Sequence, residues 1–312
     1  MATDAAPDVR VRTAGARVRN AGAHVRAYID RHFLIFFSWP ALIVMLAVTA
    51  VPFVATIGMG FTNYNLVLPG WRFIGFANFV ELWHDPQTLP IIFNTLYIVI
   101  GLTVLSTALG LLLAVLMRTA FPGIRIVRSL YTLPIMTAGI VVAITWRAMF
   151  NNQSGWINYF LGLLHLPQPL WLGDPHLAIP VVIIASLWTA VPFQAILLFA
   201  GLLTVPRELQ QAAEVDGASP FRVFWHVTLV HIRPVLFIVI LLRLIDGFRL
   251  FEQIQELTTG GPGIASTPLS LQIYNTGLLY QRLGYAAAMG VVLVLLVALT
   301  VGIIFLVLPR RN

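Results

Sequence analysis

Residues Thr88–Met117 read TLPIIFNTLYIVIGLTVLSTALGLLLAVLM, a stretch without a single charged side chain. A helix needs about 20 mostly apolar residues to cross the roughly 30 Å hydrocarbon core of a bilayer. This stretch is long enough, and others like it recur along the 312-residue chain. Apolar residues make up 59% of the chain and charged residues only 10%, whereas a soluble domain carries about a quarter charged residues. The sequence therefore predicts an all-α integral membrane protein.

Six stretches are long and apolar enough to be spans. The predicted spans cover residues 33–60, 89–117, 127–149, 177–203, 234–256 and 283–309. They form one transmembrane domain, residues 33–309, between an arginine-rich tail at 1–32 and a short end at 310–312. The charged tail is too long, and the apolar run after it too extended, for a signal peptide.

The arginines give the predicted orientation, because cytoplasmic loops of membrane proteins are rich in positive charge. Three arginines fall on one side of the six spans: Arg72, Arg147 and Arg282. Fourteen fall on the other side, at positions 10, 12, 17, 19, 26, 31, 118, 125, 128, 207, 222, 233, 310 and 311. We therefore expect both ends of the chain in the cytoplasm. The tail fixes this topology or, alternatively, also attracts anionic lipid headgroups.

Composition excludes several kinds of chemistry. The chain has no cysteine, so it has no disulfides, thiolate metal sites or cysteine nucleophiles. All 19 basic residues are arginine, and a P-loop needs a lysine to reach the terminal phosphates of ATP. No pair of histidines has convincing metal-ligand spacing. We predict no catalytic residues, no metal site and no nucleic-acid partner.

The segment between spans four and five, residues 205–233, is the most informative loop. From Val205 to Pro234 it reads VPRELQQAAEVDGASPFRVFWHVTLVHIRP. Pro206 suits the first position of a helix and Glu208 its first turn. Asp216-Gly217 ends that helix, and Ser219-Pro220 starts another as N-cap and N1. The segment predicts two short cytoplasmic helices whose apolar side chains, including Phe221 and Phe224, suit a groove on a partner protein.

This segment resembles the EAA loop of permease subunits of type I ABC importers, especially the carbohydrate-uptake group that includes maltose permeases. The family pattern is E-A-A, three residues, Gly, nine residues and I-x-L-P. Here Gln211-Ala212-Ala213 is followed by Gly217, flanked by Asp216 and Ala218, and by Val227–Val230 at the family's spacing. Gln211, Val227 and Val230 depart from it. Similar fragments occur, in family order, at 61–64, 73–79, 94–95, 188–193 and 259–263.

The resemblance implies the type I ABC importer permease fold and a division of labour. This chain is expected to form half of a translocation pathway with a second, homologous permease. Two partner subunits bind ATP and Mg, so this chain needs no cofactor, and an extracytoplasmic binding protein delivers the solute. The expected location is the bacterial inner membrane. The expected ATPase-coupling residues are Glu208, Gln211, Ala212, Ala213, Asp216, Gly217, Ala218, Phe221 and Phe224.

Charges inside a membrane span are costly and point to function. Span five carries Arg243, Asp246, Arg249 and Glu252, three residues apart, which predicts one polar stripe on a helix. Carboxylate and guanidinium groups bind hydroxyl-rich solutes well, and Asp246 is the best single candidate for solute contact. The alternative is that these charges neutralise one another and lock the structure.

Weaker candidates for solute contact lie on two other spans. On span four, Trp188 could stack on a sugar ring while Thr189 and Gln194 form hydrogen bonds, although packing alone explains such residues in membrane helices. On span two the candidates are Asn94 and Tyr97.

We interpret the chain as a permease subunit, not an enzyme, that imports a sugar, oligosaccharide or polyol by alternating access. A first alternative is an ABC permease for glycerol 3-phosphate, which the arginines favour and Asp246 and Glu252 oppose. A second is a secondary transporter driven by an ion gradient, which would require inverted repeats and more spans. A third is a membrane enzyme, which would need a convergent catalytic cluster.

Overall fold

The computed structural model describes residues 37–119 and 122–307. The predicted tail 1–32 and the end 310–312 lie outside these residues. The chain divides into two units between Gly58 and Met59. In the first unit the structure describes a single 23-residue helix, Phe37–Met59, which ends at the first residue of the second unit. Its mean hydropathy of 2.3 suits a membrane crossing.

The second unit consists of helices joined by turns and loops in the part that the structure describes. There, extended segments pair only as an isolated bridge between Thr62 and Phe73. The longer helices are α3 (Thr88–Leu116), α5 (Gly139–Met149), α7 (Pro175–Leu203), α11 (Arg233–Phe248) and α14 (Leu283–Val307). The shorter ones are α2 (Ala77–His84), α4 (Ile124–Thr132), η1 (Leu133–Met136), α6 (Trp156–Leu163), α8 (Arg207–Val215), α9 (Pro220–Val223), η2 (Phe224–Thr228), α10 (Leu229–His231), α12 (Glu252–Leu257), α13 (Leu269–Tyr274) and η3 (Asn275–Leu279).

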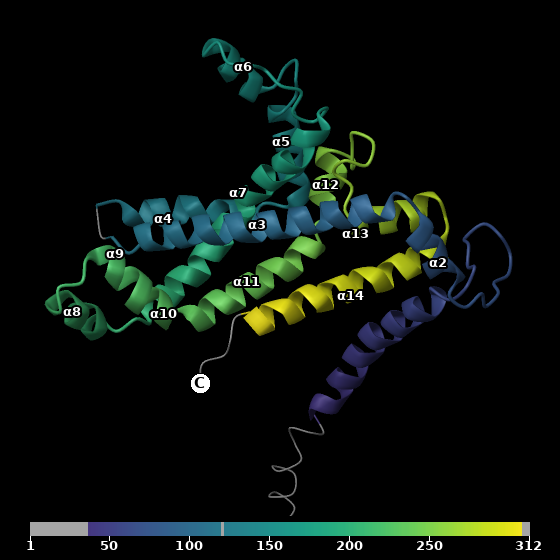
Figure 1. Cartoon of the computed structure of the whole chain (residues 1–312), viewed down its shortest axis with the longest axis horizontal. Coiled ribbons are helices and arrows are strands. Elements are labelled where there is room, and N and C mark those ends of the chain that lie inside the picture. The colour runs from purple at the N-terminus through teal and green to yellow at the C-terminus, as the bar shows by residue number, and fades with distance from the viewer. Residues whose placement is uncertain (1–36, 120–121, 308–312) are drawn as a thin grey trace, which may run out of the picture. The chain divides into compact units, whose positions relative to one another are not determined.

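The centre of this unit is the pair of 29-residue helices α3 and α7, which contact each other extensively. Helix α11 packs on both, and α14 packs on α11, α2 and α13 (Figure 1). Small residues allow close approach, as is usual between membrane helices. A Cβ on Gly110 of α3 would lie only 3.1 Å from the Cβ of Gln194 of α7. A Cβ on Gly247 of α11 would lie 3.3 Å from Cγ2 of Val99.

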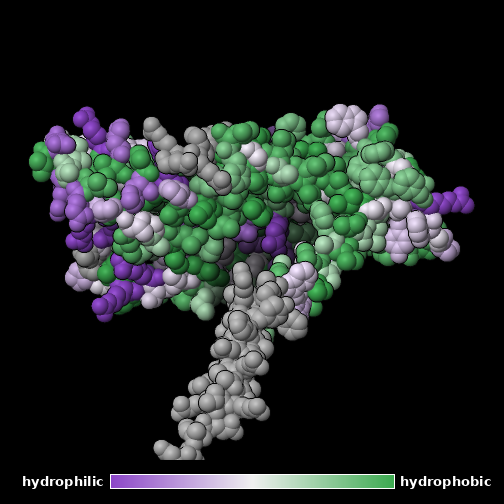
Figure 2. Space-filling model, turned by 90° about the horizontal axis from the view of Figure 1, so that it is seen from below, coloured by the Kyte–Doolittle hydropathy of each residue, from purple (hydrophilic) through white to green (hydrophobic). Residues whose placement is uncertain are grey.

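The outward faces of the long helices are apolar. On α3 the exposed side chains include Phe93, Ile100, Leu105 and Leu112. Figure 2 shows the same pattern as a broad hydrophobic surface, with hydrophilic residues concentrated toward the ends of the molecule and in a hollow within the apolar surface. A soluble protein rarely exposes apolar patches of this size, so the surface is that of a membrane protein.

Four described helices are long and apolar enough to cross a membrane: Phe37–Met59, α3, α7 and α14. The count rises to six if each of two bent pairs forms one span. The predicted span 127–149 corresponds to the first pair, which bends by 99° between Met136 and Gly139. Pro134 lies in the 3₁₀ turn η1, and Thr137 and Ala138 then adopt extended backbone. The predicted straight helix is therefore two helices at a steep angle.

The predicted span 234–256 also differs from a single helix. Helix α11 ends at Phe248, where the backbone N–H groups of Arg249 and Leu250 bond to the carbonyls of Asp246 and Gly247. These tighter i to i−3 bonds close the last turn, and α12 starts only at Glu252. At its other end α11 forms the second bent pair, at 71° to the helical run Pro220–His231.

Candidate functional site

The segment 205–233 forms the two helices that its sequence predicts. Helix α8 begins at Arg207, one residue later than expected, because Pro206 keeps extended backbone with ψ 133°. It ends at Asp216, where Gly217 has φ +81°. The N–H of Gly217 bonds to the carbonyl of Glu214 and that of Ala218 to the carbonyl of Ala213, both at 3.0 Å. This pair of bonds is a Schellman motif, which needs a left-handed residue at the position of Gly217.

The second helix starts at a side-chain cap. The Ser219 hydroxyl accepts a hydrogen bond from the N–H of Arg222 at 3.4 Å, with Pro220 in the first turn. The helical run continues through the π-helical turn η2 into α10. The turn and the cap together hold α8 and α9 in a fixed helix–turn–helix geometry.

Most of the predicted coupling residues face solvent in this chain. Exposed positions are Glu208, Gln211, Ala212, Asp216, Gly217 and Phe221, and partly buried ones are Ala213, Ala218 and Phe224. The Phe221 ring is 74% exposed and packs on Trp225, its ring centroid 6.0 Å away. Leu209 and Val215 on α8 are exposed as well. The segment thus presents an apolar surface at one end of the molecule, where it can contact another protein.

Gln210 ties this surface to the helical core, a role that the sequence did not reveal. Its Oε1 accepts a hydrogen bond from Nη2 of Arg118, just beyond α3, at 3.4 Å. Its Nε2 donates to the hydroxyl of Thr228 in η2 at 3.0 Å. Thr228 is buried. One side chain on α8 therefore contacts both the end of α3 and the second helix of the segment.

Buried apolar residues anchor the two ends of the segment. One hydrophobic cluster contains Val205 and Ile232 together with Leu198, Leu202, Ala114, Ala195 and Val239 from α7, α3 and α11. Val205 precedes α8, and Ile232 lies between α10 and α11. Both ends of the segment are thereby packed against three core helices.

The charged residues predicted as one stripe lie on different elements. Arg243 and Asp246 lie on α11, Arg249 caps its end, and Glu252 begins α12. Arg243 is partly buried, with an Nε that has no hydrogen-bond partner, whereas Asp246 and Arg249 are exposed. Among the described residues the only ion pair within 4.0 Å joins Arg282 to Glu81. Direct ion pairing does not lock these four charges together.

A polar cluster that the sequence did not indicate joins α5, α7 and α12. The buried Ser186 on α7 donates a 2.6 Å hydrogen bond to Oε1 of Gln253 on α12. Gly139, at the start of α5, makes room for that glutamine: a Cβ there would lie 3.6 Å from Cγ of Gln253 and 3.7 Å from Oε2 of Glu252. The break after α11 therefore directs Glu252 and Gln253 toward α5 and α7.

The remaining solute candidates have different surroundings. Trp188 is exposed, and the Thr189 hydroxyl donates to the carbonyl of Ser186 at 3.2 Å. Gln194 is only 1% exposed, and neither atom of its amide has a partner. Such an orphaned buried amide is costly in a finished core.

On α3, Asn94 uses its amide within the chain. Its Nδ2 donates to the carbonyls of Ile264 at 2.8 Å and Thr267 at 3.3 Å, which fastens the glycine-rich segment 259–268 to the start of α3. Tyr97 is exposed. The two residues therefore differ in role. Asn94 holds the segment 259–268 in place, whereas the ring of Tyr97 is exposed. No group of three His, Asp or Glu side chains that could hold a metal occurs in the described part of the chain.

The fold and these features define a multi-pass helical membrane protein with an exposed, partly apolar helix–turn–helix segment. Residues 106–312 match the family described as "Binding-protein-dependent transport system inner membrane component". The chain belongs to this family, whose members are transport components and not enzymes.

Named relatives agree with the family. The chain is 35% identical to the probable ABC transporter permease protein y4oQ of Sinorhizobium fredii, over 85% of this chain and 86% of the relative. It is 34% identical to the trehalose/maltose transport system permease protein MalF of Thermococcus litoralis, over 78% of this chain and 82% of that protein.

Solved structures agree on the fold. A chain of a bacterial ABC transporter involved in the import of the acidic polysaccharide alginate superposes with a TM-score of 0.78. The match covers 93% of this chain and 99% of that chain, at 23% identity. Two of the expectations from sequence, an all-helical membrane fold and an ABC transporter permease, are thus confirmed.

Proposed function

We propose that this chain is one permease subunit of an ATP-driven importer and that it takes up a neutral sugar, oligosaccharide or polyol by alternating access. In this proposal each bent pair forms one span, which gives six spans and puts both termini on one side of the membrane. The arginine distribution supports the cytoplasm of a bacterial cell as that side. The segment 205–233 then lies in the cytoplasm as the coupling segment. The helix α6 and the glycine-rich segment 259–268 lie on the external side.

The observation that carries the coupling role is the attachment of α8. Apolar side chains of α8 are exposed, where a partner subunit can bury them. Gly217 forms the turn at the end of α8, and Gln210 joins the helix to the end of α3. A nucleotide-driven movement of a partner against α8 would therefore move α3 and α7 as well. Flexible attachment would dissipate that movement in the loop.

The solute class rests on the relative that is named a trehalose/maltose permease and on the polar groups inside the bundle. Ser186, Gln194 and Gln253 offer hydroxyl and amide groups without charge, which match sugar hydroxyls as donors and acceptors. Asp246 and Trp188 add a carboxylate and an aromatic ring. In alternating access, the orphaned amide of Gln194 would gain partners from solute or from a second packing of α3 against α7.

The partners follow from the family to which the chain belongs. A second permease subunit completes the pathway, two subunits bind ATP and Mg, and an extracytoplasmic binding protein supplies the solute. The chain itself has no lysine with which to build a P-loop.

Reconstitution tests this function. The complex purified on the tagged full chain is placed in proteoliposomes with ATP inside, and radiolabelled maltose and trehalose are supplied outside with the co-purified binding protein. We expect accumulation that requires ATP and persists when ionophores collapse ion gradients. Accumulation that follows a sodium or proton gradient without ATP would overturn the proposal.

A further inference from the structure

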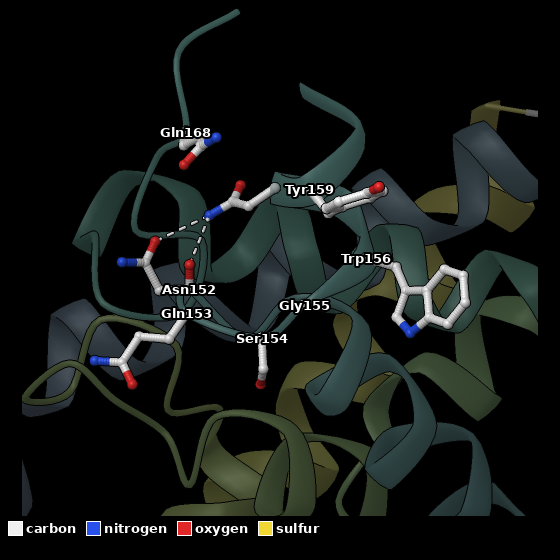
Figure 3. Close-up of a pocket in the computed structure, with 8 residues that line it drawn as sticks. Asn152, Gln153, Ser154, Gly155, Trp156, Tyr159 and Gln168 are labelled. Carbon is white, nitrogen blue, oxygen red and sulfur yellow. Dashed lines mark hydrogen bonds between the residues drawn. The ribbon is translucent and has the colours of Figure 1, made fainter. Parts of the chain in front are cut away.

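A hollow on the described surface lies away from the helical core, in the connection between α5 and α7. Its volume is about 570 Å³, which is within the range of small-molecule sites. Its polar and aromatic lining side chains are those of Asn152, Gln153, Ser154, Trp156, Tyr159 and Gln168. Figure 3 shows the amides of Asn152, Gln153 and Gln168 on one side of the turn at Gly155, with Trp156 and Tyr159 projecting from α6 on the other.

The hollow is built on a rigid base. Asn158 is buried, and its Nδ2 donates to Oδ1 of Asn152 at 2.9 Å and to the carbonyl of Pro169 at 3.3 Å. Its Oδ1 accepts from Nε1 of Trp171 at 2.7 Å. Asn158 thus fastens both sides of the connection to each other. The shape of the hollow therefore does not depend on a bound ligand.

The turn that forms the floor is equally constrained. Oδ1 of Asn151 accepts hydrogen bonds from the N–H groups of Gln153 and Ser154, both at 3.0 Å. Gly155 is buried, and a Cβ there would lie 2.2 Å from the carbonyl oxygen of Asn151. Only glycine fits this position, because a Cβ would collide with the backbone of the turn itself.

The side chains above this floor are free to bind. In the part of the chain that the structure describes, no hydrogen bond occupies the side-chain amides of Gln153 and Gln168. The Trp156 ring is 66% exposed and the Tyr159 ring 63% exposed. Each amide offers donors and an acceptor side by side, as vicinal hydroxyl groups do. An aromatic face covers the apolar C–H face of a sugar ring.

The charge of the lining selects among ligands. No charged residue lines the hollow. Recognition of a phosphate or carboxylate commonly uses Arg or Lys side chains, and the lining provides neither, although the N-terminus of α6 at Gly155 and Trp156 borders the hollow. Phospholipid headgroups and acidic sugars therefore meet no charged side chain here, whereas a neutral sugar needs none.

From this geometry we infer that the hollow at Gly155 is a binding site for a neutral hexose unit, separate from the pathway through the bundle. The inference rests on the proposed function for its external location, where the site would hold solute beside the pathway entrance. Amides of Gln153 and Gln168 bind the hydroxyl groups, and Trp156 supplies the stacking face.

A thiol-protection experiment tests the site by position, because the chain has no cysteine of its own. Ser154→Cys places a single thiol in the hollow of the full complex in nanodiscs. Leu164→Cys, just beyond the end of the same helix α6, places one at an exposed position outside the lining. With maltotriose at ten times its dissociation constant, mass action predicts about tenfold slower maleimide labelling of the S154C thiol. Labelling of the L164C thiol stays unchanged.

Second variants keep the test specific. Adding Trp156→Ala to S154C should abolish the protection, whereas Leu163→Ala removes an exposed side chain of α6 that does not line the hollow and should preserve it. The same labelling in nanodiscs that contain monoglucosyl diacylglycerol, without added sugar, shows whether the bound hexose is a lipid headgroup. Protection of the S154C thiol under these conditions would identify the lipid as the ligand. Absence of any sugar-dependent protection, or equal protection in the W156A background, overturns the site.

Uptake by the same complex tests the proposed function separately. ATP-dependent maltose uptake without protection of the S154C thiol would refute the binding site at the hollow, and the proposed importer function would stand. Protection without uptake supports the site and removes the transport assignment for that sugar.

Discussion

Arg118 and Gln210 are 92 residues apart in the sequence, and Nη2 of the arginine lies 3.4 Å from Oε1 of the glutamine. The hydrogen bond joins the end of α3 to the exposed helix α8, while the same amide donates to Thr228 in η2. A side chain with two such bonds fastens the exposed helix α8 to the core. This bond is the physical basis of the proposed coupling.

Replacing Gln210 by alanine should weaken coupling without preventing assembly. The change removes two hydrogen bonds, each contributing about 0.5–1.5 kcal/mol. We expect solute-stimulated ATPase activity and uptake to fall about tenfold, because 1.4 kcal/mol is a factor of ten. Gln211→Ala, an exposed neighbour, is the matched control. Gln210→Glu should restore function, since a carboxylate accepts from both Arg118 and the Thr228 hydroxyl. Equal ATPase activity and uptake in the Gln210→Ala and Gln211→Ala variants would contradict a coupling role for Gln210.

Gly217 provides a test based on backbone conformation alone. Its φ is +81°, and no atom lies within 4 Å of a Cβ placed there. Gly217→Val should therefore act only through backbone strain, at a cost of about 1–2 kcal/mol. We expect valine to uncouple ATP hydrolysis from uptake while membrane insertion stays normal. Gly217→Asn should retain most activity, because asparagine tolerates the left-handed region. Normal uptake by the valine variant would contradict a role for this turn in coupling.

Asn94 separates a structural role from solute contact. Its amide donates to the carbonyls of Ile264 and Thr267. Asn94→Asp replaces the donor with an oxygen facing two carbonyls, which costs about 1–3 kcal/mol or more. Hydrogen exchange of residues 259–268 should accelerate about tenfold or more. The exposed Tyr97→Phe is the control. Unchanged exchange together with a raised KM for uptake would instead assign Asn94 to the solute.

Asp246 is the charged residue on α11 with the clearest test. It is exposed in this chain and forms no ion pair within 4.0 Å with the arginines around it. Asp246→Ala should lower solute uptake at least about tenfold, the loss expected for a charge-assisted hydrogen bond of 1.5–3 kcal/mol. The complex should still assemble in detergent, as size-exclusion chromatography can show. Loss of assembly would favour a structural lock formed with a partner subunit.

The sequence predicts the helical membrane fold because hydropathy and helix length are local properties. The uncharged run of α3 and the Asp216-Gly217 turn are examples: each is set by residues close together in the chain. The direction in which one helix follows another is not a local property of the sequence. The two helices on either side of Thr137 and Ala138 are long and apolar enough only when taken together, so hydropathy predicts one span and does not indicate the 99° bend. Likewise the spacing of Arg243, Asp246, Arg249 and Glu252 suggests one face, although the helix closes at Phe248.

The candidate site also has features that the sequence predicts and features that it does not. The turn at Gly217 and the cap at Ser219 were predictable, because each depends on consecutive residues. Gln210 was not, because its two partners, Arg118 and Thr228, come from distant parts of the chain. Ser186 and Gln253 meet only because α11 ends early and α12 redirects the chain toward α7.

Purification of the tagged full chain from native membranes in mild detergent, followed by mass spectrometry, tests the central claim most directly. The proposal of an ATP-driven permease predicts that a P-loop ATPase and a second permease co-purify with this chain. Gly217→Val, which distorts the docking turn, should reduce recovery of the ATPase but not of the second permease. Recovery of the wild-type chain alone, stable and active in uptake without an ATPase, would contradict it.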